Sequence, residues 1–199
     1  ILLQSGDRRS VNEVLGRLRL ELGQPPVDEG LAFVWVVDFP MFETINDNGD
    51  PVAMHHPFTM PHPDDVDYLV RKGGESMLKI RSQAYDLVLN GWELGSGSVR
   101  IHDPEIQARV FAALGFTDEE AREKFGFLLD AFSYGAPPHA GFAFGIDRLT
   151  ALLLGETNIR EVIAFPKTQS GSDPLTNAPT PISDQHLDDL GLRVLPPAE

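Results

Sequence analysis

The stretch AGFAFGIDRL, residues 140–149, decides the fold of this chain. Small and apolar residues alternate in its first half, which predicts a strand over 140–144, and a helix ended by a glycine is expected over 147–154. Gly141 and Gly145 leave the strand backbone open to a flat ligand, because neither residue carries a side chain. A strand of bare backbone that feeds directly into a helix predicts a binding site at this junction.

An acidic and a basic residue open that helix. Arg148 is suited to stacking on an aromatic ring or to forking onto a phosphate. Asp147 is a residue type expected at a helix start, where a carboxylate accepts backbone N–H groups. In isolation the blander interpretation is favoured, in which Asp147 caps the helix and Arg148 makes a surface ion pair. The function of this pair therefore depends on its surroundings.

Upstream of this junction, strands and turns come first and helices follow. Residues 31–39 (LAFVWVVDF) are β-branched and aromatic on both sides, which predicts a strand buried on both faces. Other segments predict a helix over 64–70, strands over 84–89 and 92–94 with an interruption over 95–98, and helices over 103–114 and 117–132. This order predicts an α+β fold with a mixed, mainly antiparallel sheet flanked by helices.

Two carboxylates flank the turn at the end of the predicted hairpin. Asp86 and Glu93 are seven residues apart and have apolar neighbours. Acids in such a place suit Mg²⁺, which takes one or two carboxylates together with ligand phosphates. They are also suited to a general acid and base pair. On spacing alone, it is equally possible that the two carboxylates simply lie at the ends of the strands and have no role in binding or catalysis.

Arginine and histidine side chains mark two more candidate positions. Arg100 lies in an apolar run, and a buried guanidinium needs an anion, either a carboxylate ligand or an internal ion-pair partner. His55 and His56 are adjacent in a proline-punctuated segment, so their side chains should point to opposite sides. No zinc-binding spacing accompanies them. We expect one histidine to donate to an anionic ligand and the other to pack.

Composition limits the classes of protein that this chain can represent. The 199 residues carry 30 acidic and 16 basic side chains, a formal net charge of −14, which argues against non-specific nucleic-acid binding. Cysteine is absent, which excludes disulfides, thiolate metal sites and cysteine nucleophiles. No apolar run approaches the roughly 20 residues of a membrane span, so no membrane partner is expected. The first residue is Ile1, and we expect the true start to lie upstream.

Several segments in fixed order resemble one enzyme family: FVWVVDFPMFE (33–43), MHHPFT (54–59), AYDLVLNGWELGSGSVRIHD (84–103), EKFGFLLDAFSYGAPPHAGFAFGIDRL (123–149) and NIREVIAFPK (158–167). Together they are similar to the C-terminal half of bacterial-type aspartyl-tRNA synthetases. GFAFGIDR resembles the third signature motif of class II synthetases. The resemblance implies that 1–29 is the end of the domain inserted in the bacterial branch plus a linker. It implies that 30–199 is the C-terminal half of the catalytic domain with its tail.

The resemblance also assigns roles to matching residues. Those that would bind ATP are Glu93, Gly97, Gly141, Gly145, Asp147 and Arg148. Those that would bind aspartate are His55, His56 and Arg100, with the arginine taking the side-chain carboxylate. Glu93 and Asp86 would hold the ATP-bound Mg²⁺. The residues that would carry the catalysis are Arg148, Glu93 and Arg100.

The implied activity is that of an aspartate–tRNA ligase working in two steps. L-Aspartate attacks the α-phosphate of ATP to give aspartyl-adenylate and pyrophosphate, and the terminal ribose hydroxyl of tRNA-Asp then takes the aspartyl group. The implied partners are L-aspartate, ATP and tRNA-Asp, with tRNA-Asn as a second candidate, in a cytoplasmic homodimer. The sequence contains no anticodon-binding barrel and neither the first nor the second class II motif. We therefore expect these residues alone to be inactive.

Three alternatives stay open beside this interpretation. A noncatalytic synthetase-like paralogue would keep the fold as a binding module, but such proteins usually lose the groups that Glu93, Arg100 and Arg148 retain here. Asparagine- and lysine-specific class II relatives share GFAFGIDR-like segments, whereas HHPFT and Arg100 favour the aspartate branch. An amidating or adenylating enzyme on the same fold would share the site but lack tRNA.

Overall fold

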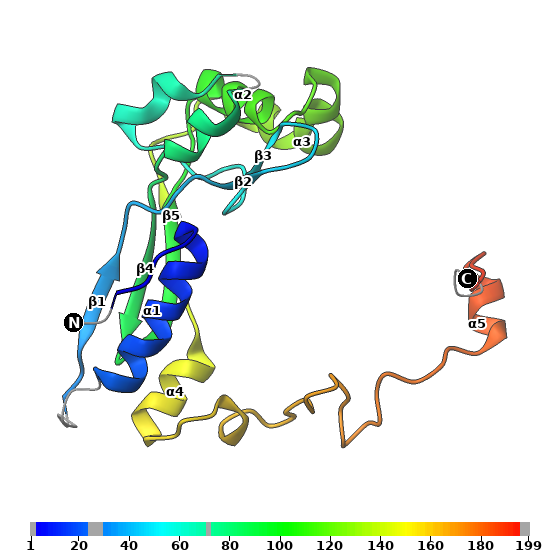
Figure 1. Ribbon diagram of the computed structural model, residues 1–199. Coiled ribbons are helices and arrows are strands. Elements are labelled where there is room, and N and C mark those ends of the chain that lie inside the picture. Colours follow the sequence, from blue (N-terminus) through cyan, green and yellow to red (C-terminus); the bar gives the residue numbers. More distant parts are fainter. Residues whose placement is uncertain (1–2, 24–29, 71–72, 196–199) are drawn as a thin grey trace.

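The structure, a computed structural model, describes residues 3–23, 30–70 and 73–195 (Figure 1). Its centre is a four-stranded sheet in the order β1–β4–β5–β6, and every neighbouring pair is antiparallel. These strands are β1 (Phe33–Val36), β4 (Ala84–Leu89), β5 (Trp92–Val99) and β6 (Ala140–Phe144). A separate hairpin joins β2 (Phe42–Ile45) to β3 (Pro51–Ala53). The predicted α+β class and the mainly antiparallel sheet are confirmed.

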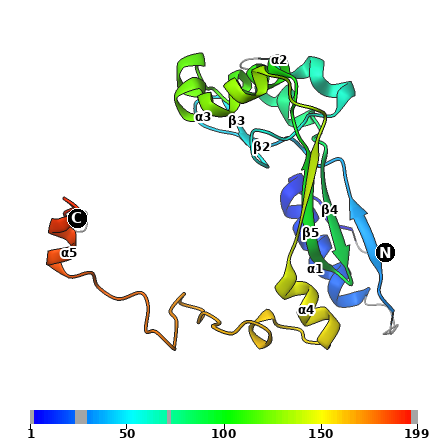
Figure 2. The ribbon, with the colours of Figure 1, turned by 180° about the vertical axis from the view of Figure 1, so that it is seen from behind.

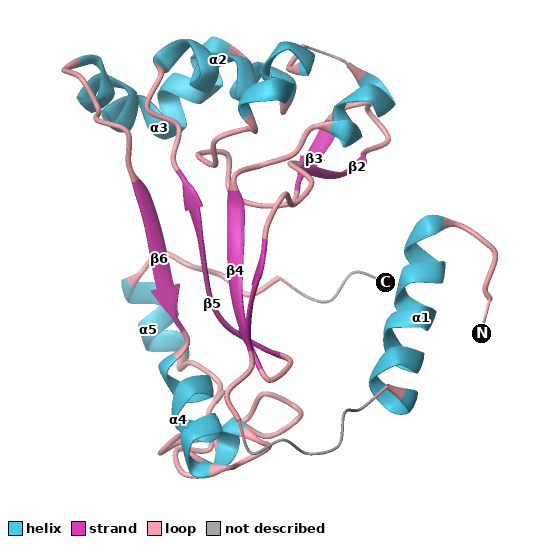
Figure 3. Cartoon of the chain, turned by 90° about the vertical axis from the view of Figure 1, so that its left-hand side faces the viewer, coloured by secondary structure: helices cyan, strands magenta, loops and turns pink. Residues whose placement is uncertain are grey.

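Helices gather at the two ends of this sheet (Figures 2 and 3). One end carries two 3₁₀ helices and two α-helices: η1 (Pro63–Tyr68), η2 (Gly74–Lys79), α2 (Pro104–Ala113) and α3 (Asp118–Ser133). The other end carries α4 (Ile146–Leu154) with η3 (Ile159–Glu161), while α1 (Arg8–Leu22) stands beside the sheet and α5 (Asp184–Asp189) ends an extended segment. In the described part of the chain, no helix has the length and apolarity needed to cross a membrane.

Capping side chains start the long helices where the sequence predicts. The Asp103 carboxylate accepts the backbone N–H groups of Glu105 and Ile106 at the start of α2. At the start of α3, Thr117 and Glu120 form the predicted capping box in both directions. These bonds satisfy N–H groups that have no partner inside the helix, so local sequence alone fixes the helix starts.

A hydrophobic core cluster lies at the end of the molecule that carries η1, η2, α2 and α3, which we call the helical end. Its fully buried members come from β2, both 3₁₀ segments, α2 and the chain between them: Met41, Phe42, Leu69, Met77, Ile80, Ile101, Val110 and Ala113. The Asp65 carboxylate ties η1 to the start of β4, since it accepts bonds of 2.9 to 3.1 Å from the side chain and backbone N–H of Arg81. The side-chain bonds hold the pKa of Asp65 below its ordinary value.

The first predicted strand differs from expectation in its burial. Residues 31–39 read as a strand buried on both faces, but β1 spans only Phe33–Val36 and its side chains are 39% to 56% exposed. The physical reason is position, because β1 is an edge strand of the sheet and the core that could have covered it lies at the helical end. The prediction that this strand is buried is therefore wrong for the described residues.

Two further local predictions are corrected. The Gly-Ser run 95–98 does not interrupt a strand, because β5 continues through it and pairs with β4 and β6 together. The segment 64–70 forms the 3₁₀ helix η1, in which Asp65 serves the tie to Arg81. The predicted linker falls mostly on residues 24–29, which lie outside the described residues.

The cross-strand register gives the sheet two chemically different faces. Antiparallel partners share a face, so Asp86, Ser96, Ser98 and Arg100 follow one side, which we call the polar face. The opposite side, which we call the aromatic face, carries Trp35, Tyr85, Phe142 and Phe144 with rings 4.8 to 6.3 Å apart. The sheet therefore separates a side suited to charged ligands from a side suited to packing.

Gly97 is required by a close approach between β5 and β6. A Cβ at this position would run into the backbone carbonyl of Gly141 and lie 2.6 Å from the Tyr85 ring. We expect Gly97→Ala in the complete protein to lower the free energy of unfolding by about 1–3 kcal/mol or more, as overpacking does. Chemical denaturation measures this loss.

The same sheet offers a matched control for that variant. A Cβ at Gly141 would meet only the end of the Arg100 side chain, at 4.0 Å. Gly141→Ala should therefore unfold at nearly the denaturant concentration of the unmodified protein. Equal losses in the two variants would show that the close approach at Gly97 is not the cause.

Candidate active site

The polar face brings together most of the residues that the sequence singled out. Asp86 lies opposite Ser96, and Gly141 lies opposite Ser98, so β4, β5 and β6 each contribute to one surface. Arg100 continues this surface beyond β5, and a Cβ at Gly141 would lie 4.0 Å from its Nη2 atom. Positions spread along the chain thus form one row on a single face of the sheet.

A β-bulge places Glu93 on the same face. The register pairs Leu87 with Gly95 and Val88 with Glu93, so Leu94 is the extra residue. If residues 93–95 formed a regular strand with no bulge, Glu93 would share the face of Gly95 and its side chain would point to the aromatic face. The carbonyl of Leu94 accepts the N–H of Gly145 at 2.8 Å, which fixes the start of α4 against β5. One irregular residue thus orients a carboxylate and attaches a helix.

Arg148 is held beside that carboxylate. Its Nη1 atom donates to the backbone carbonyl of Glu93 at 2.6 Å and lies 3.6 Å from the Glu93 Oε1 atom. An open hollow of about 420 Å³ adjoins the pair, lined by Trp92, Glu93, Arg148, Thr157, Asn158 and Ile159. This hollow has room for a nucleotide-sized group next to one guanidinium and one carboxylate.

The carboxylates of Asp86 and Glu93 act on each other across the polar face. Burial raises the pKa of Asp86, the negative charge of Glu93 raises it further, and His55 opposes both. A divalent cation would relieve this repulsion, and two carboxylates are what Mg²⁺ takes when phosphates and water supply its other ligands. Within the described ranges, no group of three or more acidic or histidine side chains would hold a metal by itself. The pair therefore fits a cation delivered with a phosphate ligand.

His56 is tied to Arg100. Its Nδ1 atom is within 3.1 Å of Arg100 Nη1, and it accepts the backbone N–H of Phe58 at 3.2 Å. Both partners are donors, so Nδ1 carries no proton and the hydrogen of neutral His56 lies on Nε2. Partial burial lowers the pKa of His56, and the positive charges of Arg100 and then His55 lower it further. Neutral His56, which can donate a hydrogen bond from Nε2, therefore lies beside the positively charged guanidinium of Arg100.

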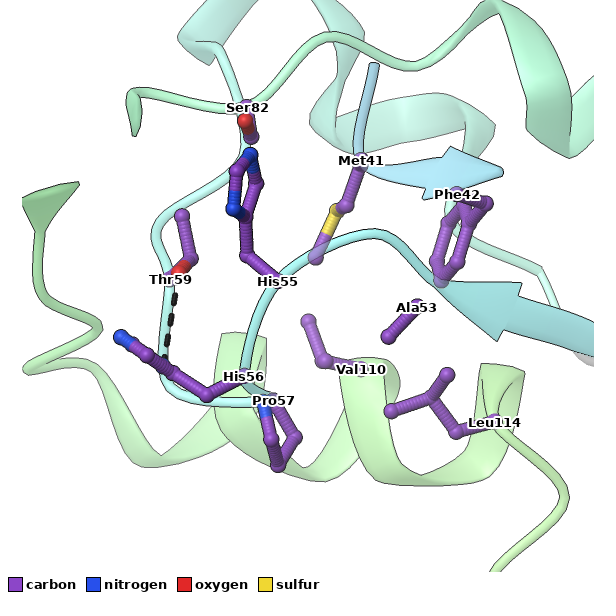
Figure 4. Close-up of a pocket in the computed structure, with 10 residues that line it drawn as sticks. All are labelled: Met41, Phe42, Ala53, His55, His56, Pro57, Thr59, Ser82, Val110 and Leu114. Carbon is purple, nitrogen blue, oxygen red and sulfur yellow. Dashed lines mark hydrogen bonds between the residues drawn. The ribbon is translucent and has the colours of Figure 1, made fainter. Parts of the chain in front are cut away.

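His55 turns to the other side of the chain, as the sequence predicts. Figure 4 shows its ring pointing toward Ser82, while His56 extends away from the pocket. His55 packs edge-on against Phe39, with ring centroids 5.3 Å apart, and its buried Nε2 atom has no hydrogen-bond partner among the described residues. The adjoining pocket measures about 10 Å³, about the volume that a single water needs. His55 therefore packs, and His56 lies beside Arg100 on the other side of the chain, while the predicted aspartate binding by both histidines stays a prediction.

The structure also places the predicted residues Gly145, Asp147 and Gly97. Gly145 precedes α4 as its N-terminal flanking residue, and Asp147 sits in the first turn without a capping bond, so the capping interpretation of Asp147 is wrong. Gly97 faces the Tyr85 ring on the aromatic face and not the polar face. Its missing side chain allows the close approach of β5 and β6, and its role in ATP binding stays a prediction.

Sequence reasoning missed one wall of the hollow. Trp92, Thr157 and Asn158 line it, although none was singled out beforehand. Asn158 caps η3 by accepting the N–H of Arg160, and the chain before it follows the left-handed Gly155 at the end of α4. A signal was present in this pairing of glycine and asparagine, which turns the chain back toward β5.

The residues of the candidate site lie within the part of the chain that matches a known protein family. Residues 16–169 match the family model described as tRNA synthetases class II (D, K and N). The chain is 52% identical to the aspartate–tRNA(Asp/Asn) ligase of Salinibacter ruber, over 99% of this chain and 32% of that protein. It is also 52% identical to the aspartate–tRNA ligase of Fervidobacterium nodosum, over 96% of this chain and 33% of that protein. The chain thus spans about a third of the length of these curated relatives.

A solved structure with a similar fold is the aspartyl tRNA synthetase from Entamoeba histolytica. It is 26% identical, the TM-score is 0.52, and the match covers 85% of this chain and 28% of that one. The asparaginyl-tRNA synthetase of the same organism, in complex with asparaginyl-adenylate, shares the fold with a TM-score of 0.52 at 19% identity, over 86% of this chain and 31% of that one.

The pairing of His56 with Arg100 predicts an acidic titration. We expect the imidazole of His56 to titrate below 6.5, because burial and the Arg100 charge both disfavour its protonated form. The pair should separate only when the pH falls below that lowered value, since protonated Nδ1 cannot accept. A pH titration of the histidine ring signals by NMR measures it.

Arg100→Leu provides the control for this titration. Removing the guanidinium should move the pKa of His56 part of the way back up, because burial remains. A His56 that titrates at or above 6.5 in the unmodified protein would contradict the arrangement.

Proposed function

Because this chain belongs to the class II tRNA synthetases of the D, K and N group, we propose that it forms the C-terminal half of the catalytic domain of an aspartate–tRNA ligase. The observation that carries the proposal is the row of charged groups on one face of the sheet. Arg100 stands at one end, Asp86 and Glu93 in the middle, and Arg148 at the other end. This order matches a small acid, a triphosphate and a nucleoside laid end to end.

Aspartate would be recognised at the Arg100 end. Its side-chain carboxylate suits the planar fork of the guanidinium, which binds such groups with two parallel hydrogen bonds. Neutral His56 holds the fork through Nδ1 and offers its Nε2 hydrogen as a further donor. A neutral amide in place of the carboxylate would leave the half-buried Arg100 charge without an anionic partner, which supports selection against asparagine.

ATP would lie at the Arg148 end, with its phosphates toward the carboxylates. Arg148 is oriented by the Glu93 carbonyl, so its guanidinium can stack on the base or neutralise phosphate oxygens without reorganising. Glu93 and Asp86 would hold Mg²⁺, which supplies charge neutralisation of the triphosphate when bound. Gly145 leaves the backbone before α4 free of a side chain beside Arg148, and Gly141 does the same beside Arg100.

The chemistry follows from this placement. A carboxylate oxygen of aspartate attacks the α-phosphorus of ATP, the bond to the β-phosphate oxygen breaks, and pyrophosphate leaves. In the second step the terminal ribose hydroxyl of tRNA attacks the aspartyl carbonyl, and AMP leaves. The residues of this chain act by positioning the two substrates in line and by balancing charge, and none of them needs to form a covalent bond.

Further parts of the proposal concern the complete protein. Residues 1–29 would close the domain inserted in bacterial members, and 30–199 would complete the catalytic domain. We place tRNA-Asp as the acceptor, with tRNA-Asn as a second candidate because the Salinibacter ruber relative is named for both. The enzyme would work as a cytoplasmic homodimer without a membrane partner. Retention of Glu93, Arg100 and Arg148 in one site supports catalysis over a noncatalytic paralogue.

Aspartate-dependent exchange of pyrophosphate into ATP tests this function. We expect the complete protein to catalyse the exchange with aspartate and not with asparagine or lysine. We expect residues 1–199 alone to be inactive, because the first and second class II motifs are not among them. In the complete protein, Arg100→Leu should lower kcat/KM for aspartate by about two orders of magnitude or more. Normal aspartate selectivity in that variant would contradict the role of Arg100.

The metal role of Glu93 makes a separate prediction. Glu93→Gln keeps the shape of the side chain but removes the charge, so the Mg²⁺ concentration at half-maximal exchange should rise about tenfold, equivalent to about 1.4 kcal/mol. Glu119→Gln, on the exposed first turn of α3, is the matched control and should leave this concentration unchanged. An unaltered Mg²⁺ requirement in Glu93→Gln would remove this residue from the metal site.

A further inference from the structure

We propose that Tyr85 is a positioning residue for the aspartate end of the site, acting from the opposite face of the sheet. Its hydroxyl donates to the backbone carbonyl of Gly141 at 2.9 Å. This inference rests on the proposed function, because it concerns the surface beneath Arg100. Tyr85 touches no substrate in this scheme, and it acts through the strand that carries Gly141.

The bond joins two strands that are not neighbours. Tyr85 belongs to β4 and Gly141 to β6, and β5 lies between them. The phenol spans β5 at Gly97, where a Cβ would lie 2.6 Å from the tyrosine ring and would collide with the Gly141 carbonyl. The glycine therefore opens the path through which the hydroxyl crosses.

Aromatic neighbours fix the direction of the tyrosine ring. Phe142 stacks on it with centroids 6.3 Å apart and an interplanar angle of 17°, and Trp35 meets it edge-on at 6.0 Å. A ring confined on two sides loses little freedom when its hydroxyl forms a bond, so the bond is pre-organised. The same packing survives if only the hydroxyl is removed.

The bond acts on the polar face through Gly141. Arg100 lies over this glycine, since a Cβ there would be 4.0 Å from Nη2, and the backbone N–H of Arg100 donates to His139 at 2.9 Å just before β6. The bond from the Tyr85 hydroxyl to the Gly141 carbonyl thus fixes the position of β6 relative to the Arg100 guanidinium. Loss of the hydroxyl would let that strand shift and would loosen the fit to a carboxylate.

Tyr85→Phe in the complete protein tests this role. One neutral hydrogen bond is worth about 0.5–1.5 kcal/mol, so we expect KM for aspartate in pyrophosphate exchange to rise about 2- to 10-fold. KM for ATP should stay unchanged, because Arg148 and Glu93 do not depend on the tyrosine. The melting temperature should change little, since the ring still packs on Phe142 and Trp35.

Phe144→Leu is the control for a purely structural effect. It removes a ring of the same face that packs on Phe142, with centroids 4.8 Å apart, and leaves Tyr85 between Trp35 and Phe142. It should lower the melting temperature without a selective change in KM for aspartate. If Tyr85→Phe leaves KM for aspartate unchanged, or raises both KM values equally, the positioning role is overturned while the proposed function stands. If the unmodified protein shows no aspartate-dependent exchange, the proposed function fails and this inference fails with it.

Discussion

One extra residue in one strand organises the nucleotide end of this molecule. The bulge at Leu94 turns Glu93 onto the polar face and directs two successive carbonyl groups toward α4. The carbonyl of Leu94 fixes Gly145, and the carbonyl of Glu93 fixes Arg148. A regular strand would satisfy the same ladder but would separate the carboxylate from the arginine. The local defect in pairing is therefore the feature that assembles the charged pair.

The two faces of the sheet differ in the size of their side chains. Only small residues (Ser96, Ser98, Gly141 and Ala143) face the polar side where β5 pairs with β6, and aromatic rings pack on the opposite side. The strands approach so closely at Gly97 that no side chain fits between them. This combination gives a flat binding surface whose stiffness comes from the opposite face, which explains why aromatic residues accompany a site for charged ligands.

Local chemistry made some features predictable from sequence and left others out of reach. The caps at Asp103 and Thr117 depend on residues three apart, so the helix starts could be predicted. Asp86, Glu93 and Arg100 could be named as candidates by residue type. Their position on one face depends on a bulge, which the alternation of side chains along a regular strand does not predict. The exposure of β1 and the side of the sheet on which Gly97 lies could not be predicted for a related reason. Burial and side-chain orientation are set by neighbouring strands that are far away in sequence.

The position of the hydrophobic core gives the two ends of the site unequal rigidity. His55 and His56 follow the β2–β3 hairpin and line a pocket with members of the buried cluster, whereas Glu93 and Arg148 lie at the end where α4 leaves Ile146, Leu153 and Leu154 exposed. Local opening is governed by how much apolar surface each region buries. The amino-acid end is therefore the more firmly packed part of the site, whereas the nucleotide end buries less apolar surface and opens more readily.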